Sequence, residues 1–141
     1  MMMNEQCPFC RNIAGLNDDC VFVERGLLVT AFLNPRQYEK GAMLLVPNEH
    51  RVTLLEMTDD ELAAIAVLSK QLAQRATDAF GASGISIWQK NGRSAGQYVG
   101  HYHMHVIPRY ADSDPKELFL GADFPRTDFE TRTEIATRLL H

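Results

Sequence analysis

Three histidines occupy alternate positions in one short segment of the chain, at His101, His103 and His105. Side chains two residues apart in a β-strand lie on the same face, so this spacing would present the three imidazoles as a row. Imidazole suits nucleophilic, acid–base and metal-ligand chemistry near neutral pH. The opposite face of the same strand is expected to pack on a core, through Tyr102, Met104 and Val106.

Three interpretations of this histidine row compete: a structural row, a metal site and a catalytic site. A purely structural row is disfavoured, because each polar group left unsatisfied in a core costs about 1–3 kcal/mol. A metal-dependent enzyme with all three imidazoles on one ion stays open, since His-x-His pairs also bind zinc. The preceding loop, residues 91–97, favours phosphate chemistry, because its glycines and its amide and hydroxyl donors could approach a phosphate closely.

The composition is typical of a soluble globular protein that forms one domain over residues 1–141, with 45% hydrophobic and 23% charged residues. The formal net charge of −4 disfavours a general nucleic-acid partner. No apolar run is long enough to span a membrane, and the first residues lack the pattern of a signal peptide, so we expect a cytoplasmic protein. Three cysteines in that compartment suggest thiols or metal ligands rather than disulfides.

Strand-like and helical patterns along the chain predict which elements position the histidine row. Five segments have the composition of strands: residues 20–25, 27–33, 41–46 and 85–89, and the histidine segment itself. A main helix begins at a capping box formed by Thr58 and Glu61 and stops at Gly81. A shorter helix follows a similar sequence at residues 127–130. The short connections predict an α+β fold with an antiparallel sheet of about five strands and one main helix.

The segment from Asn91 to Tyr110 resembles the signature of the histidine triad (HIT) superfamily, whose members are nucleotide hydrolases and transferases. Residues 32–35 and 41–50 are similar to the second sequence block of that family. The segment Cys7–Cys10 resembles the N-terminal block of its bacterial members. The chain is therefore identified by resemblance as a HIT-like protein.

The resemblance covers about residues 7–110 and leaves residues 111–141 as the expected source of leaving-group specificity. It implies a HIT-like fold, a homodimer whose sheets join, and a small-molecule nucleotide as the partner. The sequence offers a few apolar residues as dimer contacts, namely Tyr102, Met104 and the run Leu118–Leu120.

The resemblance also implies a mechanism centred on His103. Its imidazole would attack the α-phosphate of a nucleoside phosphoramidate or a dinucleoside polyphosphate, and water would then hydrolyse the covalent nucleotidyl-histidine. This attack requires a neutral ring whose other nitrogen is oriented by an acceptor, for which a backbone carbonyl is suited. His105 would contact the phosphate and help to move protons. No cofactor is required for this catalysis.

Several further residues are implied in substrate binding. Asn34 would hydrogen-bond the ribose, and Phe32 would form a wall for the base. In the glycine-rich loop, Asn91 and Gln97 are the amide side chains assigned to the substrate. Gln97 and neighbouring backbone amides would stabilise the charge that develops on the phosphate oxygens.

Three positions depart from the common family pattern. Ala42 stands where many members have histidine, and Tyr98 stands where many have Ser or Thr, so two helpers of the reaction are absent. Lys90 replaces a frequent asparagine, and its side chain could pair with a polyphosphate or be solvated. These departures keep a second function open, a nucleotide-binding or interaction protein with little turnover.

Cys7 and Cys10 form a Cys-x-x-Cys pair, which alone is ambiguous between zinc binding, redox chemistry and chance. Without a second such pair, histidines must complete a tetrahedral zinc site. The resemblance to zinc-containing bacterial members implies a structural zinc ion held by Cys7, Cys10, His50 and His101.

Overall fold

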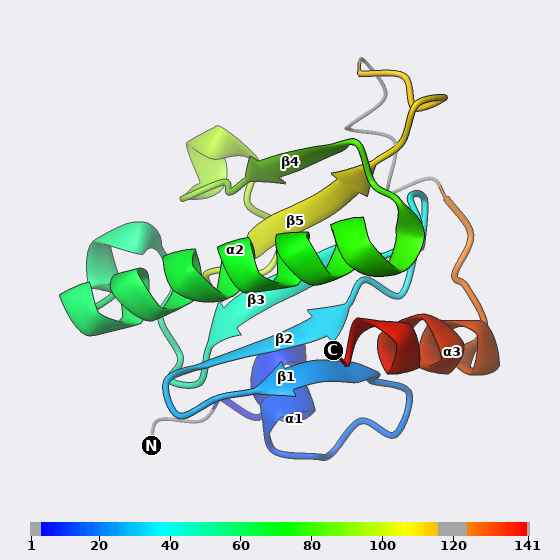
Figure 1. Ribbon diagram of the computed structural model, residues 1–141. Helices are drawn as coiled ribbons and strands as arrows, with labels where there is room; N and C mark the ends of the chain where they lie inside the picture. The colour runs from blue at the N-terminus through cyan, green and yellow to red at the C-terminus, as the bar shows by residue number, and fades with distance from the viewer. Residues whose placement is uncertain (1–3, 116–123, 141) are drawn as a thin grey trace.

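A five-stranded antiparallel sheet forms the middle of the molecule in the computed structural model, which describes residues 4–115 and 124–140 (Figure 1). The strands follow the order β1-β2-β3-β5-β4 across the sheet, which leaves β1 and β4 at its edges. Their bounds are Phe22–Arg25 for β1, Val29–Leu33 for β2, Met43–Pro47 for β3, Gly84–Trp88 for β4 and Met104–Arg109 for β5. The predicted α+β class and five-stranded antiparallel sheet are therefore confirmed.

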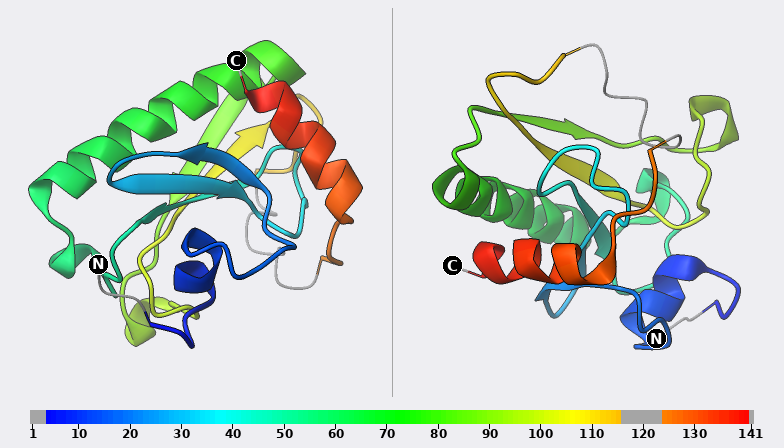
Figure 2. Two further views of the ribbon diagram at one scale, coloured as in Figure 1. Left: turned by 90° about the horizontal axis from the view of Figure 1, so that it is seen from below. Right: turned by 90° about the vertical axis from the view of Figure 1, so that its right-hand side faces the viewer.

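Helices cover both faces of this sheet (Figure 2). The long helix α2, Asp59–Phe80, lies across one face, and α3, Phe129–Leu139, packs beside it against β1. The short helix α1, Pro8–Ile13, lies on the opposite face. The face that carries α1 is only partly covered, and the candidate site lies on it.

The ends of α2 are encoded in the sequence as predicted. The Thr58 hydroxyl accepts from the Glu61 amide (3.1 Å), and the Glu61 carboxylate accepts from the Thr58 amide (2.8 Å), which is a complete capping box. Arg51 binds the same carboxylate at 3.0 Å. Burial alone would raise the pKa of Glu61, but the hydrogen bonds from the Thr58 backbone and Arg51 outweigh it and hold the pKa below its ordinary value. At the other end, Gly81 adopts the left-handed conformation (φ 73°) that ends the helix.

The main core lies between the sheet and the helices α2 and α3. It contains Tyr102, Met104 and Val106, so the residues between and after the histidines face the core as the alternation predicts. Tyr102 and Met104 are only 1% and 9% exposed, so they offer no surface to a second copy of the chain. The other predicted dimer contacts, Leu118–Leu120, lie outside the described residues.

Two predicted boundaries differ from the structure for identifiable reasons. Strand β5 begins only at Met104, because the Tyr102 amide donates to the Arg51 carbonyl (2.6 Å) instead of pairing with a neighbouring strand. The N-cap of α3 is Asp128, whose carboxylate accepts from the Thr131 amide (2.7 Å). Two short 3-10 helices, Leu54–Glu56 and Arg93–Ala95, were not predicted.

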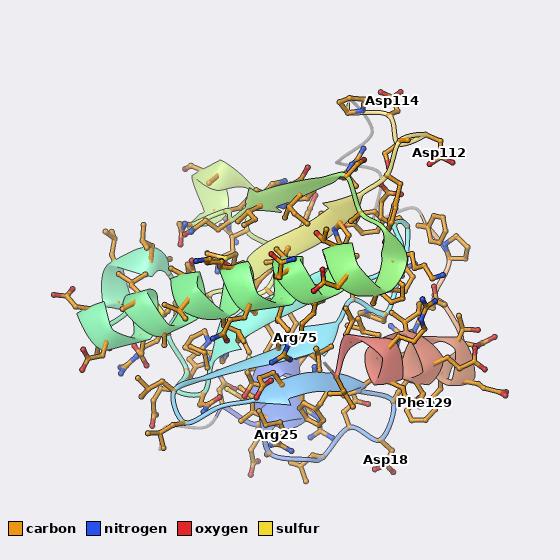
Figure 3. All side chains as sticks on the ribbon, viewed as in Figure 1. Asp18, Arg25, Arg75, Asp112, Asp114 and Phe129 are labelled. Carbon is orange, nitrogen blue, oxygen red and sulfur yellow. The ribbon has the colours of Figure 1, made fainter. Side chains whose placement is uncertain are left out.

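The segment before α3 braces the loop that follows β2. The Thr127 amide donates to the Pro35 carbonyl (2.8 Å), the Gln37 amide donates to the Thr127 hydroxyl (3.0 Å), and Arg36 donates to the Phe124 carbonyl. Helix α2 is joined to the edge strand β1 by an ion pair. Its Arg75 reaches toward β1, where it binds Glu24 at 3.0 Å (Figure 3). No helix in the described ranges combines the length and the apolar character needed to cross a bilayer.

Candidate active site

The three histidines lie together on the face of the sheet that carries α1. His105 belongs to β5, while His101 and His103 precede it in a segment without regular secondary structure. The ring centroids of His103 and His105 are 5.2 Å apart, and Phe9 of α1 contacts His101 and His103 edge-on, at 5.8 and 5.1 Å. The three rings thus lie together as the spacing predicts, although only the last of them belongs to a hydrogen-bonded strand.

His103 is held in one orientation by the backbone. Its Nδ1 lies 2.8 Å from the carbonyl oxygen of His101, so Nδ1 carries the proton and donates it to that oxygen. Nε2 then keeps its lone pair and can act as a nucleophile. Burial lowers the pKa of His103, which favours the neutral ring that such an attack requires.

His105 lies beside Trp88, with ring centroids 5.1 Å apart. Its Nδ1 is buried and has no hydrogen-bond partner in the structure. Burial, followed by the nearby charges of His103 and Lys90, lowers the pKa of His105 to about 3. The ring is therefore neutral across the physiological pH range.

A cavity of about 330 Å³ opens in front of His103 and His105. One part of its wall is apolar and includes Phe9 and Leu44, while Arg36 and Lys90 contribute positive charge. None of the described residues that line it is acidic, although the whole chain carries a net charge of −4. The cavity therefore combines an apolar surface with a cationic one, as a nucleotide requires.

Asn34 and Gln97, both predicted to bind substrate, line this cavity. The Asn34 carboxamide oxygen accepts from the Arg36 amide (2.9 Å) just after the end of β2. Gln97 is engaged more fully, because its side-chain oxygen accepts from the Gly92 amide (2.7 Å) and its nitrogen donates to the carbonyls of Val52 and Val99 (2.7 and 2.9 Å). The side chain of Gln97 thus fixes the shape of the loop.

The structure does not bring Phe32 and Asn91 to the cavity wall. Phe32 is 2% exposed and packs beneath Phe9, with ring centroids 5.4 Å apart. Asn91 accepts from the Leu54 amide (2.6 Å) and donates to Gln89 (2.8 Å), so it ties the loop to the start of a 3-10 helix. Phe9, which sequence reasoning missed, does line the cavity, as does Trp88.

The three departures from the family pattern occupy different environments. Ala42 is fully buried just before β3. Tyr98 is 92% exposed at the edge of the cavity. Lys90 lines the cavity and runs beside Gly96, where a Cβ would come within 3.7 Å of the Lys90 Nζ. Lys90 therefore belongs to the site.

The four predicted metal ligands meet in one cluster next to the histidine row. The ligand atoms of Cys7, Cys10, His50 and His101 all lie within 4.8 Å of one another. Helix α1 accounts for the cysteine spacing, because Cys7 is its N-cap and the Cys10 amide donates to the Cys7 sulfur (3.4 Å). His50 Nδ1 lies 3.3 Å from the Cys10 sulfur.

The orientation of His101 suits metal binding. Its Nε2 lies 2.9 Å from the Pro47 carbonyl, to which it donates, and its Nδ1 lies 3.4 Å from the Cys7 sulfur. Burial lowers the pKa of His101 to about 4, which keeps the ring neutral. Two sulfur and two imidazole donors, one of them fixed by a backbone carbonyl, fit a tetrahedral zinc ion.

Comparisons with known proteins agree with this geometry. The HIT domain model matches residues 16–112 of the chain. The chain belongs to the HIT family. This HIT protein is 37% identical over 111 residues to the protein hit of Bacillus subtilis, covering 78% of this chain and 75% of that one. It is 35% identical over 120 residues to the adenosine 5'-monophosphoramidase hnt1 of Schizosaccharomyces pombe, covering 84% and 83%.

A solved structure of a zinc-bound histidine triad family protein from Mycobacterium smegmatis superimposes on this HIT protein with a TM-score of 0.81. The two sequences are 26% identical, and the match covers 96% of this chain and 91% of that one. That relative is a zinc-bound member of the same family, and this HIT protein has a cysteine–histidine cluster that could hold such an ion.

Proposed function

We propose that this HIT protein hydrolyses or transfers nucleoside monophosphate groups through a covalent intermediate on His103. The observation that carries the proposal is the hydrogen bond from His103 Nδ1 to the His101 carbonyl, which leaves Nε2 available at a cavity with cationic walls. The phosphoramidase activity named for the Schizosaccharomyces pombe relative supports the same reaction class.

In the first step, Nε2 of neutral His103 attacks the α-phosphorus of the nucleotide. The Nε2–P bond forms while the bond from phosphorus to the leaving group breaks, and the leaving group departs with the electron pair. An amine leaving group takes up a proton from solvent as it departs. Amides of the loop before the histidine row stabilise the charge on the phosphate oxygens. His105 carries its proton on Nε2 and donates a hydrogen bond from it to a phosphate oxygen, because its buried Nδ1 has no acceptor.

In the second step, water attacks the phosphorus from the side that the leaving group has left. The Nε2–P bond breaks, the water gives up its proton to solvent, and nucleoside monophosphate is released. The net reaction consumes one water molecule and restores the neutral imidazole of His103.

The remaining residues of the site fit binding roles. Phe9 and Leu44 offer an apolar wall for the base, and Phe32 supports Phe9 from beneath. Asn34 is placed to hydrogen-bond the ribose, whereas Gln97 and Asn91 act by holding the loop.

The cluster of Cys7, Cys10, His50 and His101 would hold a structural zinc ion, which fastens α1 to the segment before β5. Because Phe9 lies between the two cysteines, the same cluster would also keep Phe9 at the cavity wall.

We further propose that the protein is a single-domain, cytoplasmic homodimer whose two sheets join at β4. This strand is an edge of the sheet, and an edge presents unpaired backbone groups that a second strand can pair with. Ile87 on β4 and Val67 on α2 are 49% and 56% exposed, although both are apolar. Light scattering that gives the mass of a monomer would contradict this assembly.

The decisive experiment is to trap the covalent intermediate. The protein is mixed with adenosine phosphoramidate, quenched in denaturant and analysed by mass spectrometry, and the modified peptide is sequenced. We expect an adenylyl adduct on His103 and no adduct or turnover in His103→Ala, with the zinc content of both proteins equal.

An adduct on any other residue, or turnover by His103→Ala, would contradict the mechanism. Loss of metal together with activity would favour chemistry at the metal. Tight nucleotide binding by the parent protein without turnover would favour the alternative that Ala42 and Tyr98 keep open, a nucleotide-binding protein.

A further inference from the structure

Lys90 is a cation that lines the cavity close to His105. It follows β4, two residues after Trp88, and Trp88 lies against His105. Phe9 lies at the other end of the His103–His105 pair, where its ring contacts His103. If the apolar wall at Phe9 holds the nucleoside, the end with Trp88 and Lys90 is left for the leaving group.

The position of Lys90 is set by local structure. Its side chain runs along Gly96, which has a φ of 84° at the end of the 3-10 helix in the loop. A side chain at residue 96 would both strain this backbone and approach the lysine, so glycine allows the close approach. The ammonium group also lies near enough to His105 to disfavour a positive charge on that ring.

Among the residues that the structure describes, carboxylates line a neighbouring cavity rather than the cavity at the histidine row. Asp112 and Asp114 project from the loop that follows β5 (Figure 3). With Glu39, which binds Arg109 at 3.3 Å, they line a neighbouring cavity of about 250 Å³. The cavity at the histidine row has no acidic residue among its described lining, so an anion can enter it without meeting a carboxylate there.

The described lining of the cavity at the histidine row holds two cationic side chains, Arg36 and Lys90, which is more positive charge than the reacting phosphate needs. An α-phosphate in a phosphoramidate carries one negative charge, and the loop amides and His105 can already donate to it. Lys90 therefore provides a favourable contact for a further negative charge, on the part of the substrate that leaves.

We propose that Lys90 is a specificity-determining residue that binds a phosphate of the leaving group, so that the preferred substrates carry a phosphoanhydride rather than a neutral amine. This inference rests on the proposed function. When the Nε2–P bond to His103 forms, the bond from the α-phosphorus to the bridging oxygen breaks, and that oxygen keeps the electron pair as part of a terminal phosphate. The Lys90 ammonium offsets the charge that develops there, so the leaving group needs no proton to depart.

The test compares two substrates that form the same adenylyl intermediate, a diadenosine polyphosphate and adenosine phosphoramidate. We expect Lys90→Gln to lower kcat/KM for the polyphosphate about 10- to 100-fold, the loss typical of one charge-assisted contact. For the phosphoramidate the change should stay below about twofold. Lys90→Arg keeps the charge and should restore most of the polyphosphate activity.

Arg93→Gln is the matched control, because it removes the same charge from the same loop at an exposed residue that does not line the cavity. Its kcat/KM should match the parent protein for both substrates. An equal loss with both substrates in Lys90→Gln, no loss with either, or an effect of Arg93→Gln as large as that of Lys90→Gln would overturn the inference. If the parent protein cleaves the phosphoramidate and not the polyphosphate, the inference fails while the proposed function stands. If it cleaves neither, both fail.

Discussion

Arg132 is the buried charge that fastens α3 to the rest of the protein. Its side chain is 2% exposed and donates to the Thr127 carbonyl (2.9 Å), the Asp19 carbonyl (2.6 Å) and the Asp19 carboxylate (2.8 Å). Arg126 binds the same carboxylate at 2.6 Å, but there both side chains are about half exposed. The two arginines therefore allow a buried and a surface contact to be compared at one acceptor.

Replacing Arg132 with Met keeps most of the buried aliphatic volume and removes the three hydrogen bonds. At roughly 1 kcal/mol for each bond, we expect R132M to lower the free energy of unfolding by about 3 kcal/mol. For a chain of this size, that loss corresponds to a decrease in Tm of about 10 °C. Arg126→Gln removes an exposed pair and should cost less than about 1 kcal/mol.

Urea unfolding followed by far-ultraviolet circular dichroism gives both free energies, and thermal melts give the shifts in Tm. The parent protein and the two variants must share one m-value, so that the comparison reports stability rather than a change in the unfolded state. If R132M and R126Q differ by less than about 0.5 kcal/mol, burial does not strengthen the contact to Asp19, and the reasoning is refuted.

Three further predictions follow from the core, the capping box and the metal cluster. Leu72→Ala empties a fully buried position and should cost about 3–5 kcal/mol in urea unfolding, whereas Gln71→Ala at the neighbouring exposed position of the same helix should cost less than about 1 kcal/mol; equal losses would contradict the assigned burial. The depressed pKa of Glu61 contributes stability that is present above its unfolded pKa of about 4.3 and is lost as pH falls through the lower, folded value. The difference in unfolding free energy between the parent protein and Glu61→Gln should therefore shrink from pH 6 to pH 3, and a constant difference would refute the assignment. A zinc chelator should lower the Tm of the metal-loaded parent protein and leave that of Cys10→Ser unchanged; an equal decrease in both would exclude the cluster as the site of action.

The parts of the fold that the sequence predicts are those that short-range patterns determine. The capping box at Thr58 and the glycine stop at Gly81 set the bounds of α2 without help from distant contacts. The alternation of histidines with core residues at 101–106 sets which face carries the imidazoles, because a shift of one residue in register would point them into the core instead. The five-stranded antiparallel sheet follows from the same patterns.

The parts that the sequence does not predict depend on contacts between distant segments. Helix α1 is six residues long, too short for a helical period, and its one local signal is Pro8 at the first helical position. The position of Phe9 against His103 depends on where α1 docks, so Phe32 in a recognisable strand was the apparent choice for the wall. Gln97 bonds to the Val52 carbonyl, forty-five residues away, and no local pattern shows that its amide is already engaged.

The HIT domain match begins at residue 16 and ends at residue 112, yet segments on both sides of it complete the molecule. Phe9 precedes the match together with Cys7 and Cys10 of the cysteine–histidine cluster, and α3 with Arg132 follows it. A fragment trimmed to residues 16–112 would keep every histidine of the row and the glycine-rich loop, and would lose one wall of the cavity and part of the cover of the sheet. Excision at the boundaries of the match would thus retain the imidazoles of the row and remove side chains that surround them and hold them away from solvent.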